Sequence, residues 1–189
     1  MARQKSDEKR SAILQAAIRV IDRQGLGAAT AKIAAEAGVS NGSLFTYFPT
    51  KADLLNDLYL EIKSDMAAEL MQDMPEDGPF QGRLRHAWGN WMDWASADPA
   101  RRHAMAQLMV SDEISAATRA KADTIAAPLG AFLDEIRTGG PLRDMPIGLA
   151  LRLVDGVVTA TMDAVLAEPA KAPALRAAGF DAFWRLVRG

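Results

Sequence analysis

The sequence of 189 residues contains no cysteine and only two histidines. Without cysteine the chain has no disulfide bond and no thiolate chemistry, which is typical of a protein that works in a reducing cytoplasm. Its first ten residues, MARQKSDEKR, lack the apolar core of a signal peptide. No apolar run approaches the roughly 18–20 residues that a membrane helix needs. We therefore expect a cytoplasmic protein with no membrane partner.

Runs of β-branched residues are also scarce, whereas alanine is abundant, and no useful stretch alternates apolar with polar side chains. This pattern favours helices over strands. Hydrophobic residues make up 49% and charged residues 24% of the chain, as in ordinary globular proteins. Helical periodicity and Gly/Pro breaks predict an all-α fold of about nine helices, at 6–24, 31–37, 41–48, 51–73, 80–97, 99–110, 112–138, 146–167 and 172–188.

Residues suited to capping precede or open the first four of these helices. Ser6, Thr30, Ser40 and Thr50 each carry a hydroxyl that can accept a hydrogen bond from the free N–H groups at a helix start. Thr50 with Asp53 also has the spacing of a capping box. These residues predict four closely spaced helices in the N-terminal third of the chain.

Charge is distributed unevenly along the chain. Residues 1–51 carry eight Lys or Arg against four Asp or Glu, whereas residues 52–189 carry fourteen against twenty. A basic N-terminal segment followed by an acidic remainder is the charge distribution expected of a protein that binds DNA with its N-terminal part. The net charge of −2 conceals this asymmetry.

Residues 30–51, TAKIAAEAGVSNGSLFTYFPTK, read as helix, tight turn, helix. Gly38 falls where the turn needs a positive φ, and Ile33, Leu44 and Phe48 have the spacing of core residues. This is the pattern of a helix-turn-helix whose second helix enters the major groove of DNA. A helical hairpin with a glycine turn that serves only as a protein-interaction module is the alternative.

The same segment resembles the N-terminal domain of the TetR family of transcriptional regulators over roughly residues 10–58. The resemblance rests on Gly25, Thr30, Ile33-Ala34, Ala37-Gly38-Val39-Ser40, Leu44, Tyr47-Phe48, Lys51 and Asp53-Leu54-Leu55. It implies a homodimeric regulator, commonly a repressor, that binds a palindromic operator. It further implies a DNA-binding domain at 1–51, followed by a helical domain at 52–189 that dimerises and responds to a small molecule.

Roles in DNA binding are transferred from the family by position. The positions that hold the DNA backbone are occupied by Thr30, Lys32, Ser43, Tyr47 and Lys51. The positions nearest the base edges are occupied by Asn41, Gly42, Phe45 and Thr46. Since Gly42 has no side chain for a hydrogen bond, we expect direct readout to be limited and DNA shape to contribute more.

The resemblance places the dimer interface on the last two long helices. Apolar residues on them that suit such an interface are Leu149, Leu153, Val157, Phe180, Phe183 and Trp184. Aromatic side chains are common anchors of interfaces. The alternative is that these faces are buried within their own domain.

An effector pocket is expected among the middle helices. Its candidate lining residues are Trp88, Trp91, Met92, Met105, Met109, Phe132 and Met162. Rigid Trp and adaptable Met suit an apolar or aromatic ligand, although an apolar stripe at helical spacing also forms an ordinary core.

Catalytic signatures are poor. His86 and His103 show no metal-ligand spacing, and the chain has no phosphate-binding Gly-Lys-Ser/Thr loop and no Gly-x-Ser-x-Gly elbow. We therefore expect no enzymatic activity, no cofactor and no metal.

Overall fold

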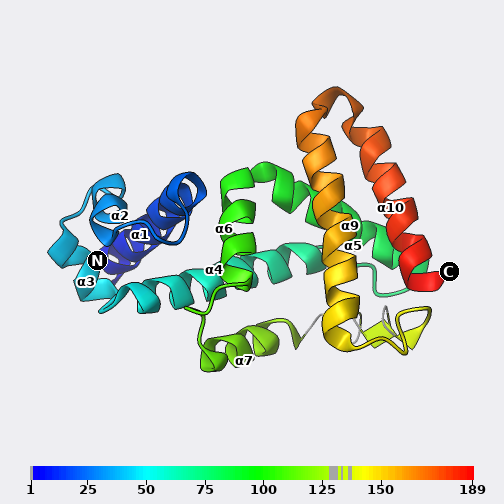
Figure 1. Cartoon of the computed structure of the whole chain (residues 1–189), viewed down its shortest axis with the longest axis horizontal. Helices are drawn as coiled ribbons and strands as arrows, with labels where there is room; N and C mark the ends of the chain where they lie inside the picture. The colour runs from blue at the N-terminus through cyan, green and yellow to red at the C-terminus, as the bar shows by residue number, and fades with distance from the viewer. Residues whose placement is uncertain (1, 128–131, 133, 136–137) are drawn as a thin grey trace. The chain divides into compact units, whose positions relative to one another are not determined.

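The computed structural model describes residues 2–127, 132, 134–135 and 138–189, and this part of the chain is helical without strands (Figure 1). The α-helices are α1 (Ala2–Gln24), α2 (Thr30–Glu36), α3 (Asn41–Tyr47), α4 (Lys51–Met71), α5 (Phe80–Ala97), α6 (Pro99–Met109), α7 (Ala116–Ile125), α9 (Ile147–Ala167) and α10 (Ala172–Arg188). A short 3-10 helix, η1 (Pro169–Lys171), precedes α10. The all-α prediction is confirmed. Among the described residues, no helix combines the length and apolar character needed to cross a bilayer.

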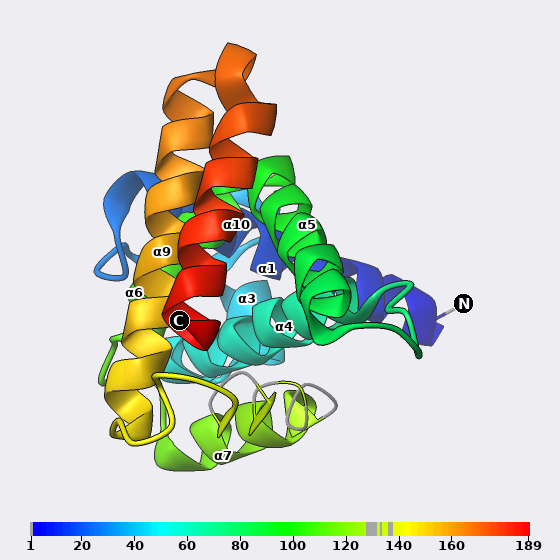
Figure 2. The same ribbon diagram turned by 90° about the vertical axis from the view of Figure 1, so that its right-hand side faces the viewer.

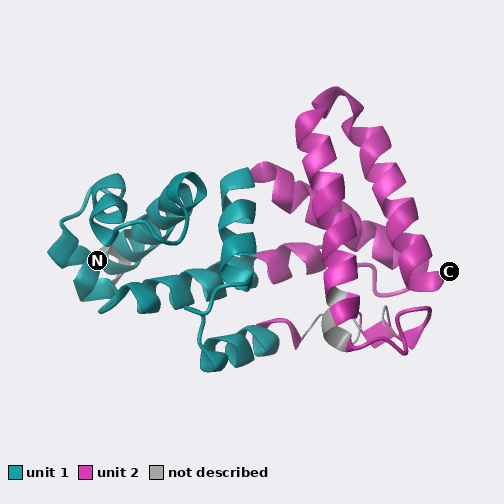
Figure 3. Cartoon of the chain, viewed as in Figure 1, with its two compact units in different colours: residues 1–65, 98–124 teal, residues 66–97, 125–189 magenta. Residues whose placement is uncertain are grey.

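The chain divides into two compact units, coloured separately in Figure 3. Unit 1 comprises Met1–Asp65 and Asp98–Thr124, and unit 2 comprises Met66–Ala97 and Ile125–Gly189. These units are defined by how the chain packs and not by what each part does. The boundary expected between a DNA-binding domain at 1–51 and a second domain at 52–189 therefore stays a prediction.

The core of unit 1 begins with the apolar stripe of α1. Ile13, Leu14 and Ile21 are buried there, because residues three or four apart share one helix face. Helices α2 and α6 both pack against α1, and α3 packs against α2. Further buried side chains of this unit are Ile33, Ala34, Leu44, Phe48, Leu54, Leu55, Leu58, Ile62, Ala104, Met105 and Leu108.

Two of the four expected caps are present and two are not. Ser40 accepts a hydrogen bond from the Ser43 N–H at 3.0 Å and caps α3. Thr50 and Asp53 form the capping box, each backbone N–H donating to the other side chain at 3.0 Å. The predictions for the other two were wrong: α1 already starts at Ala2, before Ser6, and α2 is preceded by Ala29, so that Thr30 is its first residue.

The prediction of a helix at 112–138 also placed the start of this helix too early. Helix α7 begins at Ala116, where the Ser115 hydroxyl oxygen accepts a hydrogen bond from the Thr118 N–H at 3.1 Å. A serine cap of this kind competes with continuation of a helix through the preceding residues. The helix ends at Ile125. Residues 128–131, 133 and 136–137 of the predicted span lie outside the described residues.

Unit 2 is built around the hairpin of α9 and α10, which run side by side in Figures 1 and 2, and α5 packs on both. The Trp88 ring of α5 stacks on Phe183 with centroids 5.3 Å apart and meets Phe180 edge-on at 6.1 Å. At Gly179 the α10 backbone comes so close to α9 that an added Cβ would lie 2.3 Å from the Thr161 Oγ1. Aromatic stacking and this close approach together define the core of the unit.

Candidate nucleic-acid interface

The turn between α2 and α3 has the geometry that the sequence predicted. Gly38 adopts φ +68°, a conformation that glycine reaches without steric cost. The Val39 N–H donates to the Ala34 carbonyl at 3.0 Å, which closes the turn. Leu44 and Phe48, 0% and 1% exposed, anchor the inner side of α3 and its C-terminal end. The opposite side of α3 is therefore turned away from the core.

That outer side carries the residues expected to read bases. Asn41, Gly42, Phe45 and Thr46 are all exposed. Phe45 is 39% exposed, although large aromatic side chains are usually buried in a folded protein. The Thr46 hydroxyl donates to the Gly42 carbonyl at 3.1 Å, one turn back along the helix.

The residues expected to hold the DNA backbone surround this face in sequence. Lys32 is exposed near the start of α2, while Thr30 and Lys51 are half-buried as the first residues of α2 and α4. Ser43 and Tyr47 of α3 are half-buried as well. All five belong to unit 1, and the starts of helices also expose N–H groups that favour anions.

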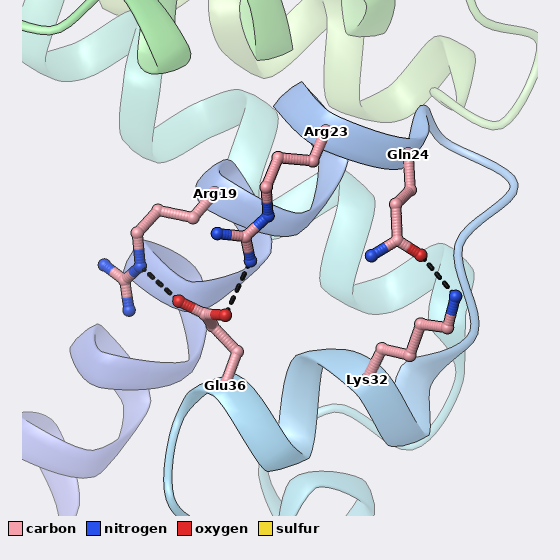
Figure 4. Close-up of polar contacts among 5 residues, drawn as sticks. All are labelled: Arg19, Arg23, Gln24, Lys32 and Glu36. Carbon is pink, nitrogen blue, oxygen red and sulfur yellow. Dashed lines mark hydrogen bonds and ion pairs between the residues drawn. The ribbon is translucent and has the colours of Figure 1, made fainter.

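A carboxylate fork fixes α2 on α1 (Figure 4). Glu36 accepts hydrogen bonds from the Arg19 Nε at 2.8 Å and the Arg23 Nη2 at 2.6 Å. The hydrogen bonds from Arg19 and then Arg23 lower the pKa of Glu36 below its usual range, because they stabilise the charged carboxylate. Beside the fork, the Lys32 ammonium donates to the Gln24 Oε1 at 2.5 Å. Arg19 and Arg23, four residues apart, share one face of α1, but their partner on α2 could not be found from the sequence.

Arg10 connects α1 with α4 and with the end of α3. Its guanidinium pairs with Asp57 at 3.1 Å and Glu61 at 3.5 Å, and it lies 5.7 Å from the centroid of the Phe48 ring. These contacts hold α4, which begins at Lys51, against α1 and the end of α3. Arg10 could not be identified from the sequence, because an isolated arginine near a chain start carries no signal of its partners.

Asn56 connects α4 with the segment before α7. Its side-chain amide donates to the Glu113 carbonyl at 2.8 Å, and its Oδ1 accepts from the Ser115 N–H at 3.0 Å. Both groups belong to unit 1. The start of α4 is thus held from two sides, by Arg10 of α1 and by the backbone before α7.

The candidate effector residues are divided between the units. Met105 and Met109 belong to unit 1, whereas Trp88, Trp91, Met92, Phe132 and Met162 belong to unit 2. Trp88 is buried and its indole N–H donates to the Arg176 carbonyl at 3.1 Å. Met92, Met105 and Met162 are buried too, while Met109 is 40% exposed. The effector pocket stays a prediction.

The candidate dimer residues also separate into two groups. Leu149 and Leu153 of α9 are 48% and 37% exposed, and Val157 and Trp184 are half-buried. Phe180 and Phe183 are instead buried against Trp88 within their own unit. Their assignment to an interface is corrected, since a side chain already covered by its own core is not available to a partner.

Comparison with known proteins agrees with this geometry. Residues 13–58 match the sequence profile of the bacterial regulatory proteins of the tetR family. An uncharacterised helix-turn-helix-type transcriptional regulator of Haemophilus influenzae is 33% identical over 89 residues, which span 47% of this chain and about half, 48%, of that protein.

Two solved structures extend the similarity over nearly the whole chain. A tetR family transcription regulator from Shewanella sp. PV-4 is 30% identical, with 94% of this chain and 96% of that one covered and a TM-score of 0.79. The TetR-like transcriptional regulator LfrR of Mycobacterium smegmatis, solved with proflavine, is 25% identical, with 94% of each chain covered and a TM-score of 0.64. These relatives are regulators rather than enzymes. With a helix-turn-helix of the observed geometry and a relative matched from end to end, the chain belongs to the TetR family of DNA-binding transcriptional regulators.

Proposed function

We propose that this protein is a homodimeric repressor that binds a palindromic operator and leaves it when a small effector binds. The observation that carries the proposal is the outer face of α3, where Asn41, Gly42, Phe45 and Thr46 are exposed beside the anchors on α2 and α4. We expect the protein to act in the cytoplasm, since that is where the operator DNA of a bacterial cell lies.

In this proposal one group of residues binds the DNA backbone and another contacts the bases. The phosphates are bound by Thr30, Lys32, Ser43, Tyr47 and Lys51. These contacts fix the position of the protein along the duplex without distinguishing one base sequence from another. Asn41 has the amide that can pair with adenine, and Phe45 suits a thymine methyl group. A palindrome requires two such helices about 34–36 Å apart, or a multiple of that spacing. The proposal therefore needs a dimer.

The α9 face with Leu149 and Leu153 supports a second copy as the partner. These leucines are four residues apart and partly uncovered, at 48% and 37% exposure, and Val157 continues the same face one turn later. A twofold contact would bury each leucine against the partner's copy of this face. Trp184 of α10 is half-buried and remains a candidate residue at the edge of this dimer interface.

The effector part of the proposal rests on the relatives. LfrR, which is 25% identical, was solved with proflavine, a flat aromatic ligand of the kind that Trp and Met side chains accommodate. We propose a pocket in unit 2 among Trp88, Trp91, Met92, Phe132 and Met162. In the dimer, the two α3 helices must have the spacing that the operator requires. An effector that binds more tightly to a dimer with another spacing would shift the population away from the DNA-bound form.

Selection of bound duplexes from random DNA tests the DNA-binding part. We expect a palindromic consensus and an affinity that falls steeply with salt. Lys51→Ala should weaken binding to all sequences alike and reduce the salt slope by about two, one for each protomer of the dimer, whereas Asn41→Ala and Phe45→Ala should change the preferred sequence. Binding without sequence preference at low ionic strength would refute the proposal.

Sedimentation tests the dimer, with a matched control on the same helix. Leu153→Glu should give monomers, because it puts a charge into the proposed interface. Leu166 has the same 37% exposure but lies about 140° away around α9 at 100° per residue, so Leu166→Glu should stay dimeric. Two variants with the same oligomeric state would contradict the assigned face.

Proflavine is a direct probe for the effector part. We expect it to raise the unfolding temperature and to release the selected duplex, and Trp91→Ala to reduce both effects. Release of DNA without stabilisation of the free protein would instead indicate that the dye binds the DNA.

A further inference from the structure

The cations drawn at the junction of α1 and α2 differ in the charge of their partners (Figure 4). Arg19 and Arg23 share the carboxylate of Glu36, which partly cancels their charge. Lys32 instead donates to the side-chain amide of Gln24, with 2.5 Å between its Nζ and the Oε1. Because an amide is neutral, the ammonium of Lys32 gains a fixed acceptor and keeps its full charge.

Gln24 is held at a defined place by the end of α1. It is the last residue of this helix, and Gly25 turns the chain out of the helix with φ +74°. The Gly25 N–H donates to the Ile21 carbonyl at 2.7 Å, and Ile21 is buried in the core of unit 1. The packing of α1 therefore fixes the backbone that carries the amide, whereas a lysine side chain by itself has many rotamers.

The ammonium of Lys32 can still bind an anion in this arrangement. A lysine ammonium carries three N–H donors, and within the described part of the chain Gln24 accepts from one of them. Both side chains are exposed, so a phosphate can reach the other two donors. A carboxylate at position 24 would accept from the same donor, but it would also cancel the charge that attracts the phosphate.

We propose that Gln24 is a positioning residue for DNA binding, which holds the ammonium of Lys32 ready for a phosphate without cancelling its charge. The inference rests on the proposed operator binding, in which Lys32 binds the DNA backbone. Gln24 restricts the rotamers of the lysine before the complex forms, so that less side-chain entropy is lost on binding. It needs no contact of its own with DNA.

Two substitutions of Gln24 separate the positioning from the charge. Gln24→Met has a similar length but no strong acceptor, so the dissociation constant for the selected duplex should rise about twofold to tenfold for each protomer, with an unchanged salt slope. Gln24→Glu keeps an acceptor but neutralises Lys32, so the salt slope should fall by about two, one for each protomer. Both variants should unfold near the wild-type temperature, because exposed substitutions usually change stability little.

Gln15→Glu is the matched control for the added negative charge. Gln15 is exposed on the same helix. At about 100° and 1.5 Å per residue, it lies on the opposite side of α1 from Gln24 and about 13 Å away along the helix axis. This distance exceeds the screening length of about 8 Å in physiological salt. The salt slope of Gln15→Glu should therefore equal that of wild type.

A double-mutant cycle tests whether Gln24 acts through Lys32. Lys32→Met should weaken binding and lower the salt slope by about two, and adding Gln24→Met to this variant should change the affinity by less than about twofold. The inference is overturned if Gln24→Glu keeps the wild-type salt slope, or if Gln24→Met weakens binding equally with and without Lys32. Lys32→Met that binds as tightly as wild type would overturn it together with the assigned phosphate contact. Wild-type protein that binds all duplexes alike would refute the proposed operator binding itself.

Discussion

The contact between Gly179 of α10 and Thr161 of α9 allows a sharp test of the packing in unit 2. A Cβ at Gly179 would lie 2.3, 2.5 and 2.9 Å from the Oγ1, Cγ2 and Cβ of Thr161. Thr161 is only 8% exposed, and its hydroxyl donates to the Val157 carbonyl at 2.8 Å. The threonine side chain is thus confined, and Gly179→Ala requires the two helices to separate.

The magnitude follows from two opposing effects. Alanine favours a helix over glycine by up to about 1 kcal/mol, whereas overpacking a closed site costs about 1–3 kcal/mol. With three atoms in one buried residue closer than 3.0 Å, we expect the steric cost to prevail by about 1–2 kcal/mol. For a chain of this length that lowers the unfolding temperature by about 2–8 °C.

Urea and thermal unfolding at equal protomer concentration measure the effect, since the stability of a dimer depends on concentration. Gly89→Ala is the control, because its Cβ meets nothing within 4 Å, and it should be stabilising. Thr161→Ala removes the two nearest atoms, so the double variant with Gly179→Ala should recover about 1 kcal/mol relative to the sum of the single changes. If Gly179→Ala stabilises as much as Gly89→Ala, the packing argument is wrong.

Three further outcomes are expected. Ser40→Ala removes the cap of α3 and should lower the free energy of unfolding by about 1 kcal/mol in urea titrations; unchanged stability would show that the cap does not matter. The lowered pKa of Glu36 means that the folded state binds the proton less readily than the unfolded state. Its stabilisation is therefore complete above about pH 4.3 and lost as the pH falls through the lowered value. Glu36→Gln should accordingly be less stable at neutral pH and lose less on acidification, and parallel curves for the two proteins would contradict this. Asn56→Leu should destabilise the protein by about 0.5–1.5 kcal/mol, because it removes the solvent-exposed hydrogen bonds to the Ser115 N–H and the Glu113 carbonyl; full stability in chemical denaturation would show that water replaces the amide without loss.

Local signals in the sequence were sufficient for several elements. The predicted spans 80–97 and 172–188 coincide with α5 and α10, because Pro and Gly breaks on their flanks limit where a helix can run. The turn at Gly38 and the capping box of Thr50 and Asp53 were likewise predictable, since each depends on residues within a few positions of one another.

Other features depended on partners that are distant along the chain. The start of α7 is marked by the local Ser115 cap, which the prediction of this helix overlooked, but the backbone before it is also held by Asn56, which lies 57 and 59 positions away from Glu113 and Ser115. Phe180 and Phe183 were assigned to an interface because the family resemblance places it on the last two long helices and because aromatic side chains are common anchors. Their burial against Trp88 depends on how α10 packs against α5, which no local pattern encodes.

The amino-acid sequence by itself determined the helical class, the helix-turn-helix and its family resemblance, because periodicity, turn residues and caps act over short distances. Tertiary structure decided which side chains remain available. It buried Phe180, left Leu153 and Phe45 exposed, and joined Glu36 to two arginines of α1. The physical reason is that exposure and partnership are set by the packing of whole helices against one another, whereas a helix and its turn are set by neighbours along the chain.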